Sequence, residues 1–218
     1  MKKLLLLLFS IFLSLQVFSQ ASIRENVPEL IERAQGMFQD DPSSSEGRKY
    51  LRIALESEPG NEEVNYLLAK SHLNDAPSQY VLNYIGKAIQ ADPTNMEYRW
   101  IRVQSLMAQM KMLQGTRLEM IDETFQDLDF LIAKESDIGK AYLIKAYLYD
   151  DLGDEWKFKV AKEASNQVSN YKTANAYYQK SLDAFHKSVG INVKYQEGLD
   201  SKAIEFKMKQ TNSKLAEF

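Results

Sequence analysis

Few residues in this chain could do chemistry, and they are scattered. The 218-residue sequence has no cysteine and two histidines, His72 and His186. The histidines lack the spacing of metal ligands on one helix face, and the nine glycines form no phosphate-binding loop. No serine stands in a pattern that suggests a catalytic triad. The sequence therefore predicts no enzyme, no metal and no cofactor, and we expect His72 to pack inside the fold.

An acidic cluster is the remaining candidate for chemistry. It consists of Asp150, Asp151, Asp154 and Glu155. A calcium loop would alternate its ligands and place a glutamate at a fixed distance after them, and this pattern is missing. We therefore expect the cluster to be the solvated end of a helix.

The first nineteen residues have the pattern of a secretory signal peptide. Lys2 and Lys3 precede an apolar run from Leu4 to Phe18, and small or polar residues follow the run. The run is shorter than the roughly 20 residues that span a bilayer. We therefore expect cleavage between Ser19 and Gln20 and no transmembrane anchor afterwards, with an uncleaved N-terminal anchor as the alternative.

Composition restricts the compartment and the partners. Without cysteine the chain can form no disulfide and can carry no lipid on an N-terminal cysteine, so burial alone must stabilise the fold. Loss of the two signal-peptide lysines would change the formal net charge from −3 to −5. An acidic chain without a basic face is not expected to bind nucleic acid. These features predict a periplasmic or secreted bacterial protein.

Two segments of the chain repeat at a fixed interval. Residues 54–61 read ALESEPGN, residues 88–95 read AIQADPTN, and their prolines are 34 positions apart. Proline cannot continue a helix, and the asparagine two residues later suits the N-cap of a new helix. Each segment is therefore a helix end, a turn and a helix start. Ala54 and Ala88 are small residues that we place where two helices cross closely.

A helix-turn-helix unit of 34 residues is the period of the tetratricopeptide repeat, and the chain resembles this family. A further match to the first helix of the unit is Tyr142, Ala146, Tyr149 and Gly153, with Gly153 closing the helix and Asp154 capping the next. The resemblance implies an all-α, TPR-like helical-hairpin solenoid of about nine helices between Ile23 and Val189.

Two capping boxes predict further helix starts. Ser43 pairs with Glu46, and Thr116 pairs with Glu119. An apolar stripe follows the second box at helical spacing. The expected organisation is a signal peptide over residues 1–19, a TPR-like repeat domain over residues 20–189 and a C-terminal tail over residues 190–218.

The resemblance also implies a binding groove. In this family the second, fifth, ninth and twelfth residues of each first helix point into the concave surface. In this chain these positions hold Glu63, Tyr66, Lys70 and Leu73; Glu97, Trp100, Gln104 and Met107; and Lys140, Leu143, Tyr147 and Asp150. The mixture suits an extended or helical peptide better than a small polar substrate. Trp100 has a second interpretation, as a core residue.

The tail allows two structures. Apolar and polar residues alternate in two short runs on either side of Gly198, which favours a β-hairpin. The runs contain Ile191, Val193 and Tyr195, and then Ile204, Phe206 and Met208. A terminal helix is the alternative, because an isolated hairpin is marginally stable.

We therefore expect an exported scaffold or adaptor that holds a protein or peptide partner on its concave face. The alternative is a peripheral subunit of a cell-envelope assembly, bound through its convex face or its C-terminal tail. A hydrolase or transferase is the rival from another class, and no acid–base constellation in the sequence supports it.

Overall fold

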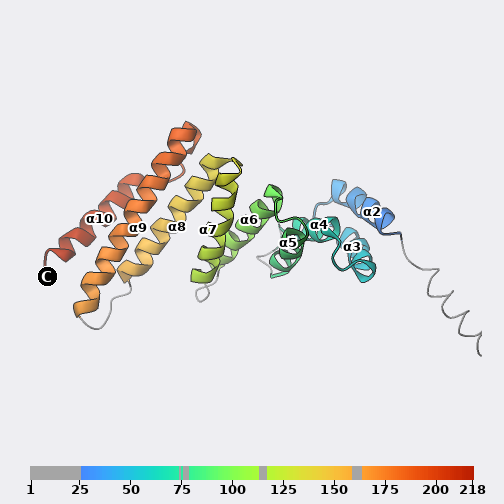
Figure 1. Ribbon diagram of the computed structural model, residues 1–218, viewed down its shortest axis with the longest axis horizontal. Helices are drawn as coiled ribbons and strands as arrows, with labels where there is room; N and C mark the ends of the chain where they lie inside the picture. Colours follow the sequence, from blue (N-terminus) through green and yellow to red (C-terminus); the bar gives the residue numbers. More distant parts are fainter. Residues whose placement is uncertain (1–25, 74, 76–78, 113–116, 159–163) are drawn as a thin grey trace, which may run out of the picture. The chain divides into compact units, whose positions relative to one another are not determined.

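The computed structural model describes residues 26–73, 75, 79–112, 117–158 and 164–218 (Figure 1). The predicted signal peptide, its cleavage site and the capping residue Thr116 lie outside the described residues. All regular structure in the described part of the chain is helical, and its nine α-helices pack in consecutive pairs. The predicted all-α solenoid class is thereby confirmed. The chain divides into two compact units, Met1–Gln109 and Met110–Phe218.

Unit 1 contains four complete helices and most of a fifth. They are α2 (Val27–Asp40), α3 (Ser45–Ser57), α4 (Glu62–His72), α5 (Gln79–Ala91) and α6 (Met96–Met112), which ends just past the unit boundary. Helix α2 packs against α3, and α4 packs against α5. Few residues of the sequence separate the two helices of each pair, as in helical-hairpin repeats.

The helix ends and helix starts predicted from the two matching segments are confirmed in unit 1. Helices α3 and α5 each end two residues before a proline. Asn61 then accepts a hydrogen bond from the Val64 amide (3.0 Å), and Asn95 accepts one from the Glu97 amide (3.0 Å). Each asparagine satisfies an amide that the first helical turn leaves unpaired. Ala54 and Ala88 are both completely buried, as expected for positions where helices cross closely.

His72 packs inside the fold, as predicted. Its ring stacks on Tyr80 and Tyr84, with centroids 5.8 and 6.3 Å away, and its Nδ1 lies 2.8 Å from a carboxylate oxygen of Asp75. Arg48 of α3 binds the same carboxylate at 2.9 Å. The histidine therefore ties the end of α4 to α5 and α3.

Unit 2 contains longer helices. They are α7 (Arg117–Ala133), α8 (Ile138–Phe158), α9 (Ala164–Ile191) and α10 (Ser201–Leu215), with a short 3₁₀ turn, η1 (Val193–Tyr195), before α10. Helix α8 packs against α7 and α9, and α10 packs against α9. Two buried serines of α9 donate to carbonyls of α8: Ser181 to Ala146 (2.7 Å) and Ser188 to Gly139 (2.7 Å). These bonds join α8 and α9 at close approach.

Three local predictions were wrong. Gly153 does not close a helix, and Asp154 does not cap one, because α8 continues through both to Phe158. A Cβ atom on Gly153 would lie 2.4 Å from the Tyr178 ring, so this glycine admits the ring of a neighbouring helix. The cap of α3 is Ser44 rather than Ser43, since Ser44 Oγ accepts from the Gly47 amide.

The β-hairpin interpretation of the tail was also wrong, and the helical alternative is confirmed. Residues 201–215 form α10, capped by Asp200, whose carboxylate accepts from the Ala203 amide (3.2 Å). Ile204 and Thr211 are buried whereas Phe206 is 61% exposed. Burial therefore follows the helical period and not the alternation that suggested a strand.

Candidate functional site

A surface of unit 1 brings several predicted groove residues together. Helices α2 and α4 and the start of α6 form it, and we call it the first-helix face. It contains Gln35, Phe38, Glu63, Tyr66, Lys70, Leu73 and Glu97. Gln35 donates to Glu63 (2.9 Å), which links α2 to α4. The Tyr66 hydroxyl donates to Glu97, which links α4 to α6.

A cation completes the polar chain on this face. Lys70 Nζ lies 3.0 Å from the Tyr66 hydroxyl and 3.6 Å from Glu97. Burial and the bond to Glu97 raise the pKa of Tyr66, so its hydroxyl stays protonated and keeps donating. The hydrogen bond to Tyr66 also raises the pKa of Lys70, so its ammonium stays charged. The first-helix face thus presents a row of one cation, one hydroxyl and one carboxylate that contact one another.

An open groove of about 500 Å³ lies on the first-helix face between α2 and α4. It is lined by Gln35, Phe38, Gln39, Pro42, Leu67, Lys70, Ser71 and Leu73. Lys70 is the one charged group in this lining, and the hydrophobic side chains around it can hold an apolar residue of a ligand. A groove of mainly apolar walls with a few fixed polar groups is the usual form of a peptide or ligand site.

Two important members of this groove were missed from the sequence. Gln35 and Phe38 of α2 precede Lys70 and Leu73 of α4 by the same interval of 35 residues. The segment before α2 lacks the proline and the capping side-chain bond that mark α4 and α6. That interval differs by one from the 34-residue spacing of the prolines, so the repeat period alone does not identify Gln35 and Phe38.

The remaining predicted residues of α6 lie on its first four turns. Glu97 and Gln104 are exposed, whereas Trp100 and Met107 are partly buried. Tyr98, which the sequence did not single out, is buried, donates to Glu62 of α4 (2.6 Å) and packs its ring 5.1 Å from Tyr66. Tyr98 therefore anchors α6 to α4 beneath the exposed polar row.

The predicted residues of α8 behave differently. Lys140 is exposed, but the other three contact the chain's own C-terminal segment. The Tyr147 hydroxyl donates to the Gly198 carbonyl, and a Cβ atom on Gly198 would lie 2.8 Å from Leu143. Asp150 binds Lys207 of α10 at 2.8 and 2.9 Å. The acidic cluster is therefore not simply a solvated helix end, because Asp150 is a paired, largely covered group inside α8.

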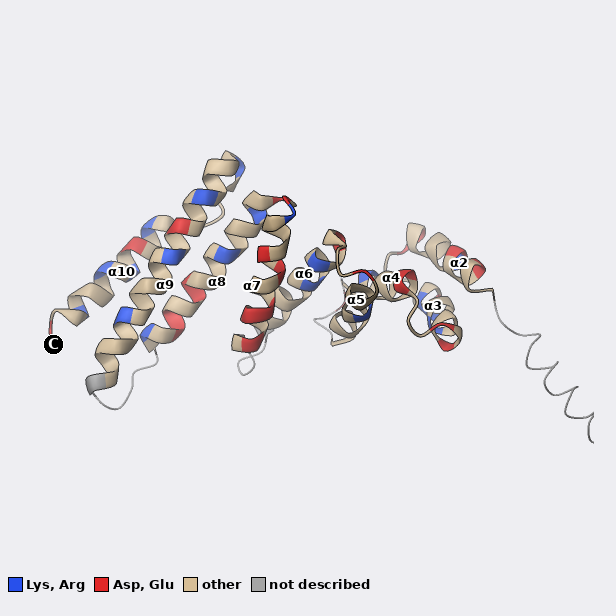
Figure 2. Cartoon of the chain, in the orientation of Figure 1, with Lys and Arg blue, Asp and Glu red and all other residues tan. Residues whose placement is uncertain are grey.

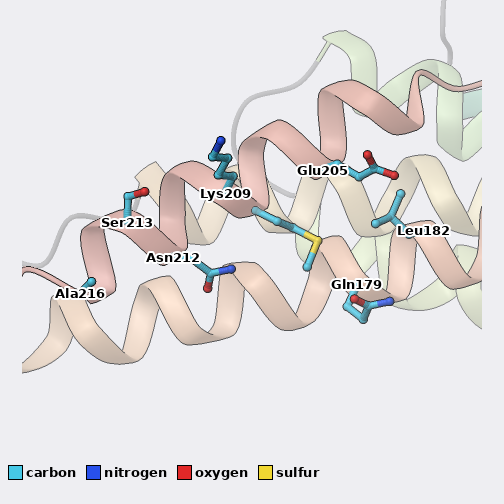
Figure 3. A pocket seen from close by; sticks show the side chains of 8 residues that line it. Gln179, Leu182, Glu205, Lys209, Asn212, Ser213 and Ala216 are labelled. Atoms are coloured by element: carbon cyan, nitrogen blue, oxygen red, sulfur yellow. The ribbon is translucent and has the colours of Figure 1, made fainter.

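A second open groove, of about 650 Å³, runs between α9 and α10 (Figure 3). In the close-up, Gln179 and Leu182 come from α9, Glu205, Lys209, Asn212 and Ser213 come from α10, and Ala216 directly follows α10. Its charged residues, Glu205 and Lys209, have opposite signs. This groove corresponds to the alternative in which the tail contacts a partner.

In the described part of the chain, no three acidic or histidine side chains converge as a metal site. Among the described helices, none combines the length and apolarity needed to traverse a bilayer. Comparison with protein-family models, curated proteins and solved structures found no match for this chain.

Proposed function

We propose that the protein is an exported, non-catalytic scaffold or adaptor that holds a protein or peptide partner on the first-helix face of unit 1. The observation that carries this proposal is the groove between α2 and α4, which contains the predicted residues Lys70 and Leu73. The sequence resemblance to tetratricopeptide repeats supports the same face. The signal-peptide pattern supports a periplasmic or secreted location.

The ligand that fits this groove best is an extended or helical segment with one large apolar side chain. That side chain would enter between Phe38, Leu67 and Leu73, and a polar or acidic neighbour would meet Lys70. The surrounding polar groups are paired with one another at the surface. A ligand can therefore replace one of these partners without leaving an unpaired charge away from water. Nucleic acid is not expected, because Glu63 and Glu97 flank the cation.

Site-specific photo-crosslinking in intact cells tests the proposal. A benzophenone side chain replaces Gln39, which is exposed and lines the groove, and in a matched variant it replaces Arg52, which is exposed on α3 outside the groove. We expect a discrete crosslinked product from position 39 that is absent from position 52 and weakened by Tyr66→Ala. Equal products from both positions, or a product insensitive to Tyr66→Ala, would contradict the proposal.

The groove between α9 and α10 favours the alternative, attachment to an envelope assembly through the C-terminal tail. The same crosslinker at Ser213, an exposed residue lining that groove, distinguishes the two. A product from position 213 with none from position 39 would favour the alternative.

A further inference from the structure

The C-terminal segment of the chain covers part of α8. Gly198 contacts Leu143 and accepts from Tyr147, and Lys207 binds Asp150. These three residues of α8 are ones that the sequence assigned to partner binding. In unit 2 the chain's own C-terminal segment therefore makes the contacts to α8 that the sequence assigned to a partner.

The groups around Lys207 form a site for a cation. Its Nζ donates to both carboxylate oxygens of Asp150 and to Asp154 (2.7 Å), and lies 5.7 Å from the centroid of the Tyr178 ring. Asp150 and Asp154 are four residues apart, so they share one face of α8. The Tyr178 hydroxyl donates to the other oxygen of Asp154 (2.7 Å) and holds that carboxylate in place.

Packing shapes this site as well as charge. Because Gly153 has no side chain, the Tyr178 ring can lie directly on α8 at this position, with its hydroxyl bonded to Asp154. Ile204 and Met208 of α10 then pack beside Lys207 on a cluster formed by Ala174, Tyr178 and Leu182, with Trp156 at its edge. We call the surface of Asp150, Gly153, Asp154, Ala174, Tyr178 and Leu182 the acidic cradle.

Polar contacts and a small apolar contact attach α10 to the rest of unit 2. Nine of its fifteen residues are exposed, and its fully buried apolar side chain in the described structure is Ile204. Thr211 adds a hydrogen bond to Asn175, and Gln210 accepts one from Lys157 (2.9 Å). A partly buried ion pair fixes geometry more than it adds stability, because desolvation offsets its attraction. The attachment of α10 is therefore specific in register without being strong.

Charge makes α10 a cationic ligand of an acidic neighbour. The helix carries Lys202, Lys207, Lys209 and Lys214 against one acid, Glu205, whereas the C-terminal half of α8 carries the acidic cluster (Figure 2). The residues of α10 that contact the cradle and the neighbouring Asn175 form a pattern: an apolar residue, a cation three positions later, a second apolar residue directly after it, and a hydroxyl four positions after the cation. In α10 these are Ile204, Lys207, Met208 and Thr211.

We propose that the acidic cradle is a binding site for a basic amphipathic helix of a partner protein, and that α10 is its internal competitor. This proposal does not depend on the first-helix face of unit 1. The short segment between α9 and α10 gives α10 an effective concentration on the order of millimolar at the cradle. A partner's helix must therefore be present above that concentration or bind the cradle more tightly than α10 does. The partner's helix gains access in proportion to the fraction of molecules in which α10 is detached.

The test uses the full mature chain and a labelled synthetic peptide of residues 200–218. In the Lys207→Met variant, Asp150 and Asp154 lose their cation, which should detach α10 and raise amide hydrogen exchange over residues 201–215. Lys209→Met is the matched control, because Lys209 is an exposed lysine of the same helix. We expect the peptide to bind Lys207→Met at least tenfold more tightly than it binds the parent or Lys209→Met.

The peptide also has its own control. A peptide with methionine in place of its lysine at 207 should not bind the Lys207→Met chain, since the cradle requires a cation. Unchanged exchange in α10 of Lys207→Met would mean that the cation does not hold the helix, and failure of the peptide to bind a loosened, folded chain would mean that the cradle accepts no external helix. Either result overturns the proposal.

A second measurement covers the case in which Lys207→Met does not fold. The parent chain is mixed with the peptide at millimolar concentration. Exchange should increase in α10 while α8 and α9 stay protected. Absence of that increase at saturating peptide would overturn the proposal without any variant.

Discussion

The two units treat the surfaces that the sequence predicted as binding sites in opposite ways. In unit 1 two of the predicted groove residues, Lys70 and Leu73, border an open groove beside α2. In unit 2 three of the four predicted groove residues of α8 contact the segment from Gly198 to Lys207. The packing of a later segment of the chain therefore decides whether a predicted binding surface stays open.

The polar contacts of the two surfaces differ in solvent exposure. In unit 1 the side chains of Lys70 and Glu97 are each 58% exposed, so water screens their pairing and their contribution to stability is small. In unit 2 Lys207 is 24% and Asp150 18% exposed. Such a covered pair is costly to break from one side, because the remaining charge has no partner. Unit 1 has an adaptable surface and unit 2 a fixed one.

The largest expected effect is a difference in unfolding free energy between two variants, each of which loses one tyrosine from one of these surfaces. Tyr178 is completely buried under α10, so Tyr178→Ala should lower the free energy of unfolding by about 3–5 kcal/mol, as for other large buried side chains. Tyr66 is partly exposed, and Tyr66→Ala should lower it by only about 1 kcal/mol. Chemical denaturation measures both. Equal losses would mean that the two surfaces are packed alike.

A smaller effect concerns the helix crossing in unit 1. Ala88 is completely buried, so Ala88→Leu should overpack the core and lower the free energy of unfolding by about 1–3 kcal/mol. Gly86 lies on the same helix with no atom within 4 Å of an added Cβ, so Gly86→Ala should stabilise the protein by about 0.5–1 kcal/mol. Thermal melts of the pair should therefore move in opposite directions. Parallel shifts would show that the register of α5 is wrong.

Local signals explain what the sequence could predict. Asn61 and Asn95 cap helices because an asparagine after a proline turn acts on amides within three residues. Ala54 and Ala88 are buried because the repeat fixes their place in a helix crossing. Each of these features depends on neighbours along the chain, so the pattern of residues contains the necessary information.

Long-range contacts explain what the sequence could not predict. Gly153 resembles a helix end until the ring of Tyr178, 25 positions later, is placed against it. The tail resembles two strands because Ile204, Phe206 and Met208 alternate with polar residues, although the buried or half-buried residues of α10 recur at helical spacing. Phe206 faces solvent, and only the position of α9 reveals which of these residues must be buried.

Trp100 offers a test of binding against packing in unit 1. It is partly buried on α6, so its exposure does not decide between a groove residue and a core residue. We expect Trp100→Ala to lower the free energy of unfolding by less than the roughly 3–5 kcal/mol of a buried tryptophan and to weaken crosslinking from position 39. Denaturation and crosslinking on the same variant measure the two effects. A full-sized stability loss with unchanged crosslinking would assign Trp100 to the core.

The smallest effect compares two paired carboxylates, one in each unit. Hydrogen bonds from Arg48 and His72 lower the pKa of Asp75 below its ordinary value of 3.8. Burial raises the pKa of Asp150 above 3.8, because it outweighs the bonds from Lys207. Those same bonds outweigh the burial of Lys207 and raise the pKa of its ammonium, which therefore stays charged throughout acid titration.

These shifts have opposite consequences for stability. The contribution of Asp75 is present above pH 3.8 and is lost as the pH falls through its lower folded pKa. Asp150 binds its proton more tightly in the folded state than in the unfolded state. As the pH falls through its raised folded pKa towards 3.8, protonation of Asp150 therefore increases the stability of the folded state. Carboxyl carbon chemical shifts, assigned with Asp75→Asn and Asp150→Asn, report both titrations by nuclear magnetic resonance. We expect Asp150 to titrate at higher pH than Asp75. The reverse order would mean that the Lys207 pair is as well solvated as the contacts of unit 1, and the contrast between a fixed and an adaptable surface would then be wrong.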